Sequence, residues 1–135
     1  MRFRISDWRL VTFRKDETGS VTIEFVLWLP LLMGLFLIAT DATVAFMRQS
    51  QMWQVSRDTA RIVSRHGMTE TVARDYATLN AAFGATVPVV DVAATGSEVV
   101  VAISAPASAM TVFGTLDFAL GENITTRVVH AMEPS

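Results

Sequence analysis

Cysteine is absent from the sequence, which excludes a disulfide framework and a thiolate metal site. Histidine is scarce as well, and neither His66 nor His130 stands at metal-ligand spacing from a second ligand residue. No segment matches a phosphate-binding glycine loop, and no serine has the context of a nucleophile elbow. We therefore expect no metal, no cofactor and no enzymatic activity.

Charged residues are few, at 18% of the chain, and they are unevenly distributed. Residues 1–19 carry five basic and three acidic residues, whereas the remainder carries six basic and ten acidic ones. A basic segment ahead of an apolar run favours a cytoplasmic amino terminus, by the positive-inside rule. The acidic remainder offers no basic surface, so we expect no nucleic-acid partner.

The longest apolar run covers residues 21–47, and Glu24 and Asp41 are its only charged residues. As a helix this run would be about 40 Å long, against about 30 Å for the hydrocarbon core of a bilayer. The wholly uncharged part, residues 25–40, would span only about 24 Å. A membrane span must therefore extend past Glu24, extend past Asp41, or thin the bilayer. A carboxylate in a membrane segment is costly, so Glu24 needs a functional explanation.

Pro30 lies inside this run, where it removes one backbone hydrogen bond and favours a kink that membrane helices tolerate. Two other readings of the run stay open. One is a secretory signal peptide, for which Ala39, Thr40 and Ala42 offer a cut site. The other is a signal anchor that is never cut.

The start of the apolar run carries a more specific pattern. Gly19 closes the charged leader, the apolar residues follow at once, and Glu24 comes five residues after the glycine. This pattern resembles the prepilin-peptidase site of type IV pilins, and Phe25 directly after the glutamate fits the Flp (type IVb) branch. The resemblance implies a cut between Gly19 and Ser20. It also implies that Glu24 compensates the charge of the new α-amino group, often on a neighbouring subunit.

The whole layout is most similar to the TadE-like minor pseudopilins of tight-adherence pilus systems. The major Flp pilin is usually much shorter, and TadF-like proteins, which share the site, remain an alternative. The resemblance implies a single-pass protein of the bacterial inner membrane, with the pilus as a further location. Its regions would be a cytoplasmic leader (1–19), a transmembrane helix (20–47) and a periplasmic domain (48–135). The implied partners are the inner membrane, prepilin peptidase, other pilins or pseudopilins, and the pilus assembly platform.

Beyond the apolar run the sequence predicts a small α+β domain of pilin type. The long helix can continue to His66, because no proline or glycine intervenes before Gly67, a candidate C-cap. We expect Trp53 to anchor the core. The expected apolar face of this part consists of Met52, Val55, Thr59 and Ile62.

A second helix is predicted over residues 69–83, capped by Thr69. Its expected core face consists of Val72, Tyr76, Leu79 and Phe83.

Three antiparallel strands are predicted over residues 86–93, 98–104 and 123–132, with a hairpin turn at 95–97. Residues 106–120 form a loop or a short helix. Because three strands make a thin core, we expect the sheet to pack on the long helix. The main alternative function is an uncut membrane protein whose periplasmic domain binds a ligand or partner. A membrane-anchored enzyme is the third hypothesis.

Overall fold

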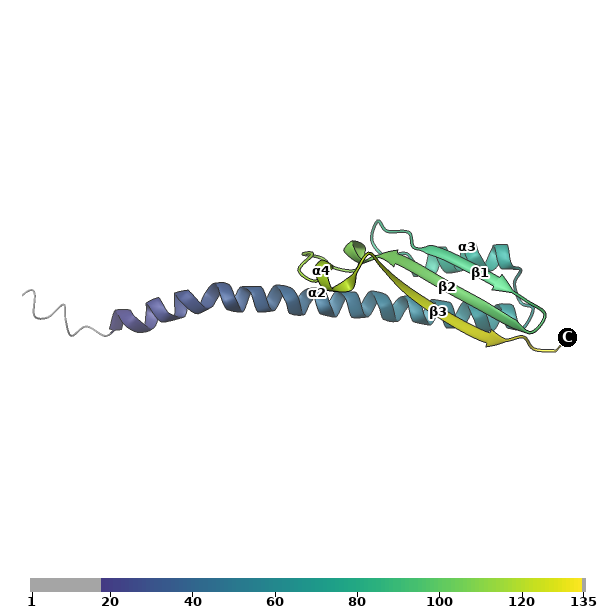
Figure 1. Cartoon of the computed structure of the whole chain (residues 1–135), viewed down its shortest axis with the longest axis horizontal. Coiled ribbons are helices and arrows are strands. Elements are labelled where there is room, and N and C mark those ends of the chain that lie inside the picture. Colours follow the sequence, from purple (N-terminus) through teal and green to yellow (C-terminus); the bar gives the residue numbers. More distant parts are fainter. Residues whose placement is uncertain (1–17, 135) are drawn as a thin grey trace, which may run out of the picture. The chain divides into compact units, whose positions relative to one another are not determined.

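The computed structural model describes residues 18–134, with side chains from residue 22 onward, and the predicted leader up to residue 17 lies outside this range. Contacts within the chain define two compact units, with the boundary after Phe36. One long helix, α2 (Thr18–Ser64), contributes to both. The second unit adds helix α3 (Glu70–Ala81) and a three-stranded antiparallel sheet (Figure 1). The predicted α+β class, with a long apolar helix followed by a second helix and three strands, is confirmed.

The described part of the first unit is the amino-terminal part of α2, and its apolar side chains are exposed on every side of the helix. Leu27, for example, is 71% exposed. Pro30 lies inside the helix, as predicted, and the kink stays a prediction. Among residues 18–134, α2 is the one helix long and apolar enough to cross a membrane. A helix that is apolar all round requires lipid or other helices around it.

Helix α2 ends in a Schellman motif. The backbone N–H of His66 donates to the carbonyl of Val63 at 2.9 Å, and that of Gly67 donates to the carbonyl of Ile62 at 3.0 Å. The left-handed residue is His66, with φ of 59°, so the prediction that Gly67 is the cap was wrong by one residue. Glycine is favoured at position 67 for a steric reason, because a β-carbon there would lie 3.0 Å from the Ile62 side chain.

The sheet has the order β1-β2-β3, with β1 at Val89–Ala94, β2 at Glu98–Pro106 and β3 at Asn123–Ala131. The predicted hairpin is confirmed, and the Thr95 N–H closes its turn by donating to the Glu98 carbonyl at 2.8 Å. The first strand begins later than predicted, because Thr86 pairs with Phe83 in an isolated bridge instead. Between β2 and β3, the predicted loop or short helix is a 3-10 turn, η1 (Ala107–Ala109), and a short helix, α4 (Asp117–Leu120).

The sheet packs on α2, as the thin three-stranded core led us to expect. Buried residues of α2 and of all three strands lie in the same region, and the Ser56 and Thr126 hydroxyls form a 3.2 Å hydrogen bond between α2 and β3. The predicted apolar face of α2 is partly right, since Met52 and Thr59 are buried whereas Val55 and Ile62 are half-buried. The other buried positions of α2 are mostly small. They are Asp41, Ala45, Ser56, Ala60, Val63 and Ser64.

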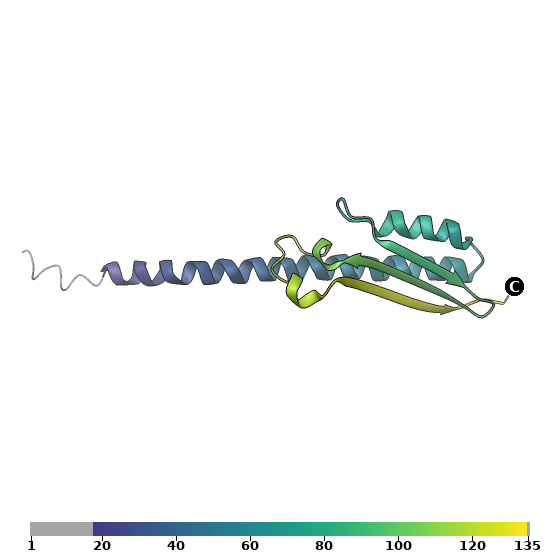
Figure 2. The ribbon, with the colours of Figure 1, turned by 45° about the horizontal axis from the view of Figure 1, so that its top comes forward.

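Helix α3 lies beside β1 and turns an alanine face to the core (Figure 2). Its fully buried residues are Ala73, Ala77 and Ala81. The predicted core face was therefore only partly right: Val72 and Leu79 are exposed, the latter at 79%, whereas Tyr76 is half-buried and Phe83, beyond the end of the helix, packs against the core. Small side chains occupy the buried face of α3 because they let the helix backbone approach the strand closely. Thr69 is the N-cap residue, as predicted, but its side chain makes no capping hydrogen bond.

This corrected helix face is open to a direct test. Ala77→Leu should destabilise the second unit by about 1–3 kcal/mol, because added methylenes have no space in a filled core. Leu79→Ala is the reverse exchange, on the exposed face of the same helix. It should alter the free energy of unfolding by less than about 0.5 kcal/mol. Denaturant unfolding of the full chain in detergent measures both. If Leu79→Ala is the more damaging change, the face predicted from the sequence is the correct one.

Candidate functional site

The residues of the predicted peptidase site lie in the first two turns of the described part of α2. Gly19 and Ser20 have helical backbone, and Glu24 and Phe25 follow with exposed side chains. Within residues 18–134, Glu24 has no hydrogen-bond or ion-pair partner. The described part of the chain therefore brings no second functional group to Glu24.

Asp41, the other charged residue of the apolar run, is fully buried in the second unit. Its Oδ1 accepts hydrogen bonds from the backbone N–H groups of Val112 and Phe113, both at 2.8 Å. Its Oδ2 accepts from the N–H and the hydroxyl of Thr115, both at 2.7 Å. We call Asp41 with residues 112–115 the Asp41 clamp. Four short bonds to one carboxylate offset the cost of burying its charge.

A second connection holds the same loop two helical turns further along α2. Arg48 donates from Nη1 to the carbonyls of Ala109 and of Thr111, the latter at 3.3 Å, and its guanidinium lies 5.1 Å from the centre of the Phe83 ring. The Thr111 hydroxyl in turn donates to Asp117 at 2.7 Å. Positions 41 and 48 are seven residues apart and share one face of the helix. The loop between β2 and β3 is therefore fixed to α2 at two levels.

Sequence analysis assigned no role to Asp41, although the sequence contained a signal. An isolated acid in an apolar helix is costly and normally has a partner. That partner lies more than 70 residues away in the sequence and consists mainly of backbone N–H groups. No pattern of side chains marks such donors, so sequence reasoning had no means of finding them.

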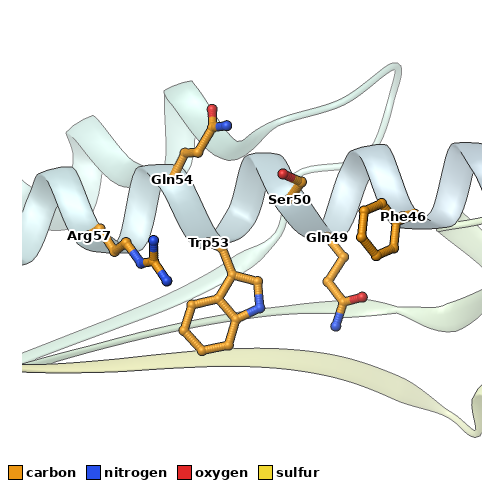
Figure 3. A pocket seen from close by; sticks show the side chains of 6 residues that line it. All are labelled: Phe46, Gln49, Ser50, Trp53, Gln54 and Arg57. Atoms are coloured by element: carbon orange, nitrogen blue, oxygen red, sulfur yellow. The ribbon is translucent and has the colours of Figure 1, made fainter.

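A shallow hollow lies on the surface of α2 in the second unit, where Figure 3 shows Gln49, Trp53 and Arg57 projecting from the helix. Trp53 is 37% exposed and Arg57 lies over its ring, 5.7 Å from the ring centre. The expectation that Trp53 anchors the core was therefore wrong, because its side chain lies at the surface of the second unit while Met52 and Ser56 are the buried positions next to it on α2.

The two histidines lie apart, His66 at the end of α2 and His130 on an exposed position of β3. Over the described range, 18–134, no three His, Asp or Glu side chains are grouped so that they could hold a metal ion. The one described feature with concentrated polar chemistry is the Asp41 clamp, and all its hydrogen-bond donors face a single acceptor group.

Comparison with known proteins gives one match to a protein family. The family model described as TadE-like protein matches residues 19–61, which begin at the predicted cut site and end three residues before the end of α2. This match, over about a third of the chain, confirms the resemblance to TadE-like proteins. No curated protein and no solved structure gives a significant match.

Proposed function

We propose that this chain is a minor pilin or pseudopilin of a tight-adherence pilus system and that prepilin peptidase cuts it between Gly19 and Ser20. The observation that carries the proposal is the TadE-like match, which points to a pilus-associated protein and starts at the proposed cut site. The long apolar helix supports membrane anchoring by a single span. The protein has a structural role in this proposal and no catalytic one.

The exposed amino-terminal part of α2 supports assembly through helix contacts. Its apolar side chains suit lipid before assembly and the helices of other subunits afterwards. A cut after Gly19 creates an α-amino group, which is positively charged at neutral pH. Glu24 then neutralises this charge across a subunit contact, where the low dielectric strengthens the attraction. The proposed partners are other pilins or pseudopilins, the assembly platform and the inner membrane, with the leader in the cytoplasm and the second unit in the periplasm.

The intact mass of the membrane-extracted protein, with and without the host prepilin peptidase, tests the proposal. We expect a product beginning at Ser20 only when the peptidase is present. Gly19→Val should block the cut, because glycine leaves the scissile bond free of a side chain. Gly34→Val is the matched control, since position 34 lies in the same helix with open space around it. A chain that keeps residues 1–19 with the peptidase present is an uncut anchor, and the proposal is then wrong.

A further inference from the structure

The segment that closes the Asp41 clamp, residues 112–120, has an unusual distribution of polarity, and we call it the inverted segment. Its polar side chains, those of Thr115 and Asp117, are half-buried and bonded to Asp41 and Thr111. Its exposed positions are all apolar or glycine. They are Val112, Phe113, Gly114, Phe118 and Ala119. Loops in water normally show the opposite arrangement.

The exposure of these apolar side chains is large. Phe118 is 88% exposed, and Val112 and Phe113 are each 56% exposed. Asp117 is the only charged residue between positions 105 and 121, and its carboxylate accepts from a neighbouring threonine. Large apolar side chains exposed together in one short segment mark a site of contact with a membrane or another protein.

The position of the inverted segment along the chain selects the membrane. The clamp fixes the segment to Asp41, the first charged residue after the uncharged stretch 25–40. In the second unit, η1, α4 and the loop between them lie beside the part of α2 that carries Asp41, in both views (Figures 1 and 2). Just beyond the clamp, α2 exposes Phe46 and Met47 as well.

The length of the helix agrees with this assignment. A span from residue 22 to residue 40 would be about 28 Å long, close to the hydrocarbon thickness of about 30 Å. It would carry Glu24 near one end and stop before Asp41. Of the three ways to complete the span, extension past Glu24 is therefore the one that the clamp favours, since Asp41 is already occupied by the folded domain.

We infer that the inverted segment lies in the membrane interface, where Phe113 and Phe118 contact lipid headgroups and the upper acyl chains beside α2. The Asp41 clamp then seats the folded domain directly on the bilayer instead of on a free tether. Apolar groups inserted about 5–10 Å into the interface are a known mode of surface binding. The inference rests on the membrane anchoring of the proposed function and is independent of cleavage and of filament assembly.

Because the chain has no cysteine, single cysteines give clean labelling sites. Full-length Phe113→Cys and Phe118→Cys proteins, carrying an environment-sensitive fluorophore, would be placed at one chain per nanodisc of phosphatidylcholine and phosphatidylglycerol. Leu31→Cys, in the apolar part of α2, is the lipid-exposed reference. Leu79→Cys, on the exposed face of α3, is the water-exposed control. We expect brominated lipid to quench the labels at 113 and 118 several-fold more than the label at 79.

Each outcome is decisive. Labels at 113 and 118 that behave like the label at 79 overturn the inference. Labels that are shielded from an aqueous quencher but not quenched by brominated lipid indicate a protein contact, which also overturns it. If the label at 31 is not quenched by lipid, the chain is not inserted, and the proposed membrane anchoring fails rather than the placement of the inverted segment. Protease resistance equal to that of the unmodified chain shows that each variant is folded.

Discussion

Replacing Asp41 by alanine should cost the second unit about 3–4 kcal/mol of stability, a large part of what a small domain has. The change removes four hydrogen bonds and leaves the N–H groups of Val112, Phe113 and Thr115 without their acceptor. Each buried donor left unsatisfied costs about 1–3 kcal/mol, and the lower part of that range applies because water can reach a loop once it moves. The loss of the clamp should be visible as rapid proteolysis within residues 105–122.

Asp91→Ala is the matched control for this prediction. Asp91 lies on β1 with an exposed side chain, and its ion pair with Arg74 is 3.6 Å long and solvated. Its removal should change the stability by less than about 0.5 kcal/mol. Asp41→Asn should be intermediate, because the amide keeps one oxygen but turns an NH₂ toward groups that also donate. Equal stability of Asp41→Ala and Asp91→Ala in denaturant unfolding would show that the clamp contributes nothing.

The elements of this fold follow closely from local sequence. Helix α2 is predictable because only Pro30 and Gly34 interrupt its described interior beyond residue 22, and Gly67 stands just past its end. The hairpin is predictable because Thr95, Gly96 and Ser97 separate two valine-rich runs. These features depend on neighbours in sequence, and the structure reproduces them within a few residues.

The faces of the elements were harder to predict, because a face depends on what packs against it. In α3, hydrophobicity alone favours Val72 and Leu79 over the alanines, yet close approach to β1 selects Ala73 and Ala77. The same reasoning misplaced Trp53, since its size suggested a core position. The largest omission was Asp41, whose partners are backbone groups far away in the sequence.

Replacing Glu24 by alanine should leave the peptidase cut intact and strongly reduce pilus assembly. Glu24 lies beyond the proposed scissile bond, so the peptidase has no need of its carboxylate. In an assembled pilus, however, the new α-amino group would lack its compensating charge. An unpaired charge in an apolar environment costs about 2.5–3.5 kcal/mol on insertion scales, which corresponds to about a hundredfold less incorporation. The intact mass reports the cut, and a count of pili, or of subunits incorporated into them, reports assembly.

Glu122→Ala provides the comparison for Glu24→Ala, because it removes an exposed carboxylate from the second unit. It should leave both the cut and assembly unchanged. Glu24→Gln should fail in assembly as Glu24→Ala does, since it keeps the size and polarity of the side chain but not the charge. Normal assembly of Glu24→Gln together with failure of Glu24→Ala would assign Glu24 a hydrogen-bonding role. Normal assembly of both variants would count against Glu24 as the residue that pairs with the new amino terminus, and its position in an apolar helix would then need another cause.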